Sequence, residues 1–178
     1  MVGVLGEGSV DRVRATGGTA RGGAFQSRTQ IHVPGVASGE APARAVAQPA
    51  SFATDAFYAI NAERRANGRP EYQLSDDLSL AATARVDEMV QEGYIDHDDP
   101  DGENSYTQIM DRLGFRWTRA GENILLGLPG LTPRQMVDKF MGSRPHRANL
   151  LDGDFTQVGI ASGDFRGQPL EVVLFREP

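Results

Sequence analysis

The fold class is decided by two apolar runs near the C-terminus, Val158-Gly159-Ile160 and Leu170-Glu171-Val172-Val173-Leu174-Phe175. Both are short and rich in the residue types that strands favour. Between them lies Asp164-Phe165-Arg166-Gly167-Gln168-Pro169, whose glycine and proline are typical of a turn. We therefore expect the two runs to form a pair of strands.

Helical patterns precede these strands along the chain. We expect helices over residues 52–67, 76–92 and about 106–113, and a fourth that begins at Pro133. Ser75 is suited to cap the second helix, and Gly93 is suited to end it in a left-handed conformation. Thr132 and Gln135 form a capping-box pattern around Pro133. Because helices come first and strands collect late, the sequence predicts an α+β domain with helices packed on a small, mostly antiparallel sheet.

The apolar spacing also predicts which side chains form the core. The second helix is expected to bury one stripe, made of Leu78, Ala82, Val86, Met89 and Val90. In the fourth helix Phe140 continues the stripe of Met136 and Val137. We therefore expect Phe140 in the core rather than in contact with a ligand.

Length and composition divide the chain into an arm and one domain. The 178 residues, of 19.2 kDa, suffice for a single domain of ordinary size. Residues 1–50 hold nine of the 21 glycines and three of the ten prolines, with Phe25 as the single aromatic residue. Such a segment buries too little apolar surface to offset its ordering entropy. We expect a flexible or disordered arm over 1–50 and the folded domain over 51–178.

Several classes of protein are excluded at this stage. A net charge of −6 and a pI of about 5.0 argue against a nucleic-acid binder held by phosphate contacts. No apolar run approaches the roughly 18 residues of a membrane helix, and the start of the chain shows no signal-peptide pattern. Because cysteine is absent, the chain has no disulfides, thiolate zinc site or cysteine nucleophile.

Two histidines and one glutamate stand out as candidates for chemistry. His97 and His146 lie in polar, turn-rich contexts, and Glu122 lies at the edge of an apolar run. A carboxylate entering such a run usually has a partner, because burying it alone costs several kcal/mol. Two imidazoles and a carboxylate could hold a divalent metal or act as an acid–base cluster. Separate roles in capping, turns and hydrogen bonding remain the alternative.

Two other kinds of site receive less support from the residues. The acidic loop 96–103 lacks the residue order and distal glutamate of an EF-hand, which favours ordinary turn chemistry over calcium binding. Ser143 stands three residues before His146, but no Gly-x-Ser-x-Gly elbow exists and no third member of a triad is marked.

Six segments, taken in order, resemble a known family. They are Asn61–Gly68, Leu78–Ala84, His97–Gly102, Gly121–Ile124, Pro145–Leu151 and Phe155–Ile160. Together they are similar to the CAP superfamily, or SCP domain, of cysteine-rich secretory, antigen 5 and pathogenesis-related proteins. The resemblance runs from about Phe57 to Phe175 and is to the bacterial branch, which the absence of cysteine also fits.

This resemblance implies a three-layer α-β-α sandwich with a central cleft. In the family two histidines and two acids line that cleft and can hold a divalent cation, here zinc or magnesium. His97 and Glu122 fall on two of the four positions, and His146 belongs to the bacterial pattern. Asp154 stands where the eukaryotic branch has its second histidine, and Ser143 stands where the second acid is often found. The implied site is therefore His97, Glu122 and His146, with Asp154 and Ser143 as further members.

Three functions follow as hypotheses. The first is a non-enzymatic binding domain, periplasmic or extracellular, that takes a cation in the polar cleft and a lipid or other small ligand nearby. The second is a hydrolase in which a metal on His97, Glu122 and His146 activates water against a peptide or cell-wall substrate. The third is a structural or adhesive envelope protein. The binding hypothesis is preferred, because no second acid is visible as a general base unless Asp154 serves.

Overall fold

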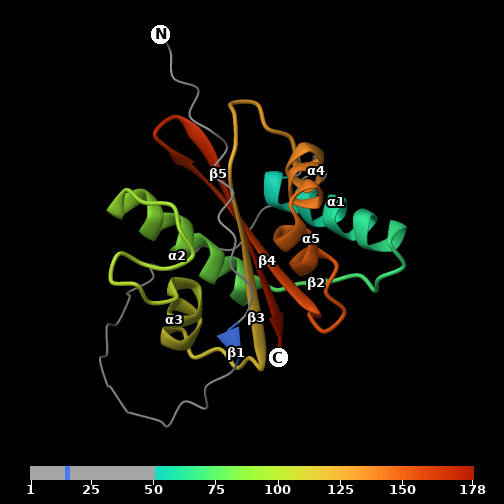
Figure 1. Ribbon diagram of the computed structural model, residues 1–178, viewed down its shortest axis with the longest axis horizontal. Coiled ribbons are helices and arrows are strands. Elements are labelled where there is room, and N and C mark those ends of the chain that lie inside the picture. The colour runs from blue at the N-terminus through green and yellow to red at the C-terminus, as the bar shows by residue number, and fades with distance from the viewer. Residues whose placement is uncertain (1–14, 17–50) are drawn as a thin grey trace, which may run out of the picture.

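The computed structural model describes residues 15–16 and 51–178 (Figure 1). The prediction of a flexible arm falls on residues 1–50 and, apart from the pair Ala15–Thr16, lies outside the described residues. The helices are α1 (Phe52–Ala66), α2 (Asp76–Glu92), α3 (Ser105–Arg112), α4 (Pro133–Gly142) and α5 (Arg144–Leu150). The strands are β1 (Ala15–Thr16), β2 (Gln73–Leu74), β3 (Arg119–Leu126), β4 (Gln157–Phe165) and β5 (Gln168–Glu177).

The strands of the described residues form one mixed sheet in the order β1-β3-β5-β4-β2. Three of its pairings, β1 with β3, β3 with β5 and β5 with β4, are antiparallel. The short β2 runs parallel to its neighbour β4. The prediction of a small, mostly antiparallel sheet is confirmed, and β2 makes it mixed rather than purely antiparallel.

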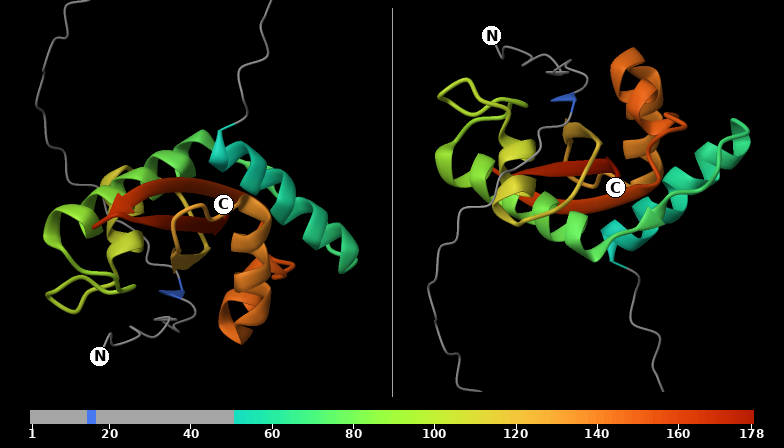
Figure 2. Two further views of the ribbon diagram at one scale, coloured as in Figure 1. Left: turned by 90° about the horizontal axis from the view of Figure 1, so that it is seen from above. Right: turned by 90° about the horizontal axis from the view of Figure 1, so that it is seen from below.

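Helices cover both faces of this sheet, as Figure 2 shows. Neighbouring side chains of a strand point to opposite faces, and the core accordingly divides in two. Val172 and Leu174 of β5 belong to an apolar cluster with α2 and α3. Val173 and Phe175 belong to a second cluster, with α1, α4 and α5. The three-layer arrangement that the family resemblance implied is therefore present.

The helix ends follow the capping signals of the sequence. Ser75 Oγ accepts from the Leu78 amide at 3.3 Å, and Gly93 ends α2 at a φ of 77°. Thr132 and Gln135 close a full capping box at the start of α4. Phe140 is completely buried, as expected. The described residues contain no helix that is long and apolar enough to cross a membrane.

Some elements differ from the sequence prediction. Glu122, at the edge of its apolar run, lies inside strand β3, which the sequence pattern did not predict. His146 lies in helix α5, which follows α4 directly, rather than in a turn. The late strands are longer than their apolar runs, because a two-residue turn joins them at Arg166 and Gly167, with φ values of 56° and 85°. These differences decide which side chains come into contact.

Candidate functional site

Glu122 is the centre of a buried polar cluster. Its side chain points to the sheet face that α2 covers, and only 1% of the residue is exposed. Oε2 lies 2.7 Å from His97 Nδ1, so the imidazole donates this hydrogen bond to the carboxylate. Oε1 accepts from Arg85 Nε at 3.1 Å. The expected meeting of His97 and Glu122 is therefore observed, with Arg85 as an unexpected third member.

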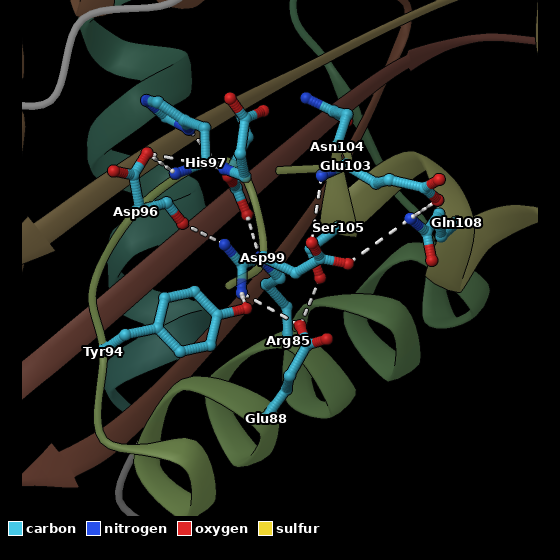
Figure 3. A network of polar contacts seen from close by, with 12 residues as sticks. Arg85, Glu88, Tyr94, Asp96, His97, Asp99, Glu103, Asn104, Ser105 and Gln108 are labelled. Atoms are coloured by element: carbon cyan, nitrogen blue, oxygen red, sulfur yellow. Dashed lines mark hydrogen bonds and ion pairs between the residues drawn. The ribbon is translucent and has the colours of Figure 1, made fainter. Parts of the chain in front are cut away.

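Arg85 links this carboxylate to the loop after α2. The side chain is fully buried, and its Nη1 atom donates to Glu88 Oε2 and to the Tyr94 hydroxyl, both at 2.9 Å. Its Nη2 atom donates to the carbonyl of Asp96 (Figure 3). Burial lowers the pKa of Arg85, but Glu122, Tyr94 and Glu88 more than offset this and raise the pKa overall. We call Arg85, Glu88, Tyr94, His97 and Glu122 the polar cluster.

The loop that carries His97 is held by its own side chains. Asp96 accepts from the backbone amide of His97 at 2.7 Å. The carboxylate of Asp99 accepts from the amides of Asp101 and Glu103, each at 2.9 Å. Aspartate side chains commonly accept such bonds from nearby backbone amides in turns, which is the role that the sequence favoured for this loop. The loop therefore presents His97 to Glu122 in a fixed position.

His146 approaches β3 from helix α5. Its ring packs edge-on against Phe140 with the ring centroids 5.2 Å apart, and its carbonyl accepts from Asn123 Nδ2 at 3.0 Å. Asn149 Nδ2 donates to Asn123 Oδ1 at 3.0 Å and to the Glu122 carbonyl at 3.1 Å. Asn123 and Glu122 are neighbours on a strand, so their side chains point to opposite faces. His146 thus helps to fasten α5 to β3 and packs with the second apolar cluster.

The two further candidates lie in other places. Asp154 is exposed and forms an ion pair with Arg119, at the start of β3. Arg119 precedes Glu122 by three strand residues, or about 10 Å. Asp154 therefore belongs to a surface ion pair and not to the polar cluster. Ser143 is the half-buried residue between α4 and α5, and its carbonyl accepts from the Arg147 amide at 2.8 Å.

A divalent cation does not fit these residues as the sequence hypothesis placed it. Arg85 and His97 already occupy both oxygens of Glu122, and a cation there would have to displace them or sit beside a buried guanidinium. Within residues 15–16 and 51–178, no three His, Asp or Glu side chains are grouped as a metal site requires. The geometry of His97, Glu122 and His146 therefore does not support a zinc or magnesium site on these residues.

Arg85 is the residue that sequence reasoning missed, although a signal for it exists. The predicted stripe of α2 places positions 78, 82, 86 and 89 in the core, and position 85 falls on the same face. A charged residue there must have buried partners. The stripe prediction was instead wrong at its end, since Val90 is 41% exposed. Asn123 and Asn149 carry no such signal, because their partners become neighbours only in the folded chain.

Comparison with known proteins identifies the family to which this chain belongs. Residues 57–170 match the cysteine-rich secretory protein family, CAP. The uncharacterized protein YkwD of Bacillus subtilis is 35% identical over 100 residues, which are 56% of this chain and 38% of YkwD. The chain therefore spans well under half of that relative.

Three solved structures share the fold. An extracellular protein containing an SCP domain, from Bacillus anthracis, matches with a TM-score of 0.61 and 22% identity over 71% of this chain and 40% of its own. A cysteine-rich secretory protein of Staphylococcus aureus has a TM-score of 0.60 and 18% identity, covering 80% and 43% of the two chains. An outer surface protein of Borrelia burgdorferi has a TM-score of 0.60 and 17% identity, covering 68% and 88%.

Proposed function

The chain belongs to the cysteine-rich secretory protein family, and from this premise we propose that it is a non-enzymatic binding domain for an anionic amphiphile, such as a fatty acid. The ligand would lie in a pocket beside α4, which we call the apolar pocket. It is lined by residues 128–131 and by Gln135, Asp138 and Lys139. We further propose that the domain acts outside the cytoplasm, which the B. anthracis and B. burgdorferi proteins, described as extracellular and as an outer surface protein, support.

The state of the polar cluster argues against catalysis. Arg85, His97 and Glu122 are each at most 2% exposed. Both carboxylate oxygens of Glu122 are bonded, so the group is not placed to take a proton from water or substrate. The cluster instead joins α2, the loop after it and β3, three elements distant in sequence. A role in holding the domain together accounts for its burial and its contacts.

The observation that carries the proposal is the chemistry of the apolar pocket. It has a volume of about 390 Å³, and its lining combines the apolar residues Leu128, Pro129 and Leu131 with the basic residue Lys139. Leu128 is 66% exposed, so its side chain leaves apolar surface open to a ligand at this place. The charge of Asp138 is answered by Arg134 at 2.8 Å. We therefore place the chain of the ligand against these apolar side chains and its carboxylate on the side of the pocket that Lys139 lines.

The size of the expected affinity follows from burial. Each methylene removed from water contributes about 0.8 kcal/mol. A tail that places about eight methylenes against the pocket gains at most roughly 6 kcal/mol, and the freedom lost on binding is subtracted from this, so the dissociation constant should be larger than about 10–100 µM.

Calorimetric titration with laurate tests this proposal. Leu128→Ser and Lys139→Gln should each weaken laurate binding several-fold, because one removes apolar contact and the other removes the charge. Leu80→Ser is the matched control, since Leu80 is 56% exposed on α2, away from the pocket. Loss of binding in the control to the same extent, or no saturable binding of laurate by the unaltered chain, would refute the proposal.

A further inference from the structure

A second hollow, on a different part of the surface, is lined mainly by charged side chains, in contrast to the apolar pocket. We infer that Arg69, Arg144 and Arg147 form a site for a phosphate-bearing ligand, independent of the proposed amphiphile pocket. These three side chains line a hollow of about 400 Å³ together with Asp152 and Gly153. We call it the arginine pocket. Nothing in the polar cluster or in the apolar pocket requires three arginines at this place.

In the described part of the chain, these three arginines have no acidic side chain as an ion-pair partner. By contrast Arg65, Arg119 and Arg134 each pair with a carboxylate. Three like charges that share one hollow repel one another, so a local excess of this kind favours an anion.

The single acid in the hollow does not cancel that excess. Asp152 bonds to Arg119 Nη2 at 3.1 Å, and its other oxygen accepts from the amide of Asp154 at 2.9 Å. Asp152 is one acid against three arginines in the lining, so the hollow keeps an excess of positive charge. The chain as a whole carries a net charge of −6, which makes a concentration of positive charge here a local feature.

The backbone of segment 149–152, beside the arginine pocket, is held in place by buried contacts. Arg64, only 1% exposed, donates from Nη1 to the carbonyls of Leu150 and Asp152, at 2.8 and 2.9 Å. The Tyr72 hydroxyl donates to the Asn149 carbonyl at 2.9 Å, and the Arg64 guanidinium stacks 3.5 Å from the Tyr72 ring centroid. These bonds tie α1 to the end of α5, so segment 149–152 need not be ordered when a ligand binds.

The three arginines come from two segments of the chain. Arg69 follows α1, and its side chain approaches Gly153. A Cβ atom built on that glycine would lie 3.5 Å from Arg69 Nη1. Arg144 and Arg147 are separated by three residues on α5, which places them on one side of that helix. Planar guanidinium groups bind phosphate oxygens in pairs, and they suit this anion better than a lysine does. Phosphate, as a free polyphosphate or as a lipid headgroup, is the chemistry that fits.

The test uses the full chain and two probes, pyrophosphate in calorimetry and phosphatidylglycerol vesicles in sedimentation, with phosphatidylcholine vesicles as the neutral reference. Arg144→Gln and Arg147→Gln should each weaken binding about fivefold, as expected for one charge-assisted bond at a surface. Arg112→Gln is the matched control, because Arg112 is exposed on α3 and its removal changes the net charge equally. All three positions are exposed, so folding should be unaffected, which circular dichroism checks.

The outcomes separate the possible sources of the phosphate. Saturable pyrophosphate binding that only the two pocket variants weaken supports the site and assigns it a soluble phosphate. Binding to phosphatidylglycerol vesicles alone, with the same pattern among variants, supports it with a lipid headgroup as the ligand. No binding to either probe, or an equal loss in Arg112→Gln, overturns the inference. Because laurate binding depends on different residues, failure here leaves the proposed function standing, and the reverse also holds.

Discussion

The buried carboxyl of Glu171 should make the stability of this domain depend on pH. Glu171 lies on β5, is 2% exposed, and faces Ser162 across the β4–β5 pairing. Burial raises the pKa of Glu171 from 4.5 to about 7, although the hydrogen bond with Ser162 opposes this. The perturbation we propose is Glu171→Gln, which keeps the shape and the polar end but cannot ionise.

The magnitude follows from the difference between the folded and unfolded pKa values. A rise from 4.5 to about 7 corresponds to about 3 kcal/mol, at 1.36 kcal/mol per pH unit. The folded state binds the proton more tightly, so the stabilisation is complete below pH 4.5 and is lost as the pH rises through 7. Above that pH the charged carboxylate destabilises the fold, and the glutamine variant should be the more stable protein.

Urea unfolding between pH 4 and 8 measures this directly. The free energy of unfolding of the unaltered chain, relative to Glu171→Gln, should fall by about 3 kcal/mol across the range. Glu92→Gln, at an exposed position of α2, is the control and should run parallel to the unaltered chain. Parallel curves for Glu171→Gln as well would show that Glu171 ionises in the folded state without penalty and would refute the reasoning.

Four further outcomes are expected. Phe140→Ala should cost about 3–5 kcal/mol of unfolding free energy, because it opens a cavity in the second apolar cluster; an unchanged urea midpoint would place Phe140 outside the core. Arg85→Met should also cost about 3–5 kcal/mol, because Glu122 stays buried without its cation; a smaller loss would mean that water reaches the carboxylate. Zinc at millimolar concentration should leave the melting temperature unchanged, whereas a rise with the logarithm of its concentration would restore the metal hypothesis. Deleting residues 1–50 removes the two-residue strand β1 and should lower the melting temperature by less than about 5 °C, and a larger drop would show that the segment contributes more to stability than this short pairing suggests.

The sequence could predict those features of the fold that depend on contacts between residues close together in the chain. The caps of α2 and α4 depend on contacts within one turn of helix, so Ser75, Gly93 and Thr132 marked them correctly. The family resemblance brought together His97 and Glu122, which no spacing rule would have joined. The same segments did not show that Arg85 completes the pair.

The missed elements depend on distant partners. Strand β3 was not recognised because Glu122 and Asn123 interrupt its apolar pattern, and their partners Arg85 and Asn149 come from α2 and α5. Helix α5 has only seven residues, and its polar sequence with Pro145 near the start resembles a turn, although proline is also favoured in the first helical turn. The place of His146 could not follow from its sequence context alone, since it depends on packing against Phe140 and on the Asn123 bond.

We propose that ligand binds beside α4 and that the polar cluster only supports the fold. A titration of isotope-labelled protein with laurate, followed by amide chemical shifts in NMR, distinguishes these two sites. We expect saturable shifts at Leu128, Leu131 and Lys139, with the amide of His97 unchanged. Shifts centred on His97 and Glu122, with Leu128 and Leu131 unmoved, would contradict this proposal and make the polar cluster the binding site.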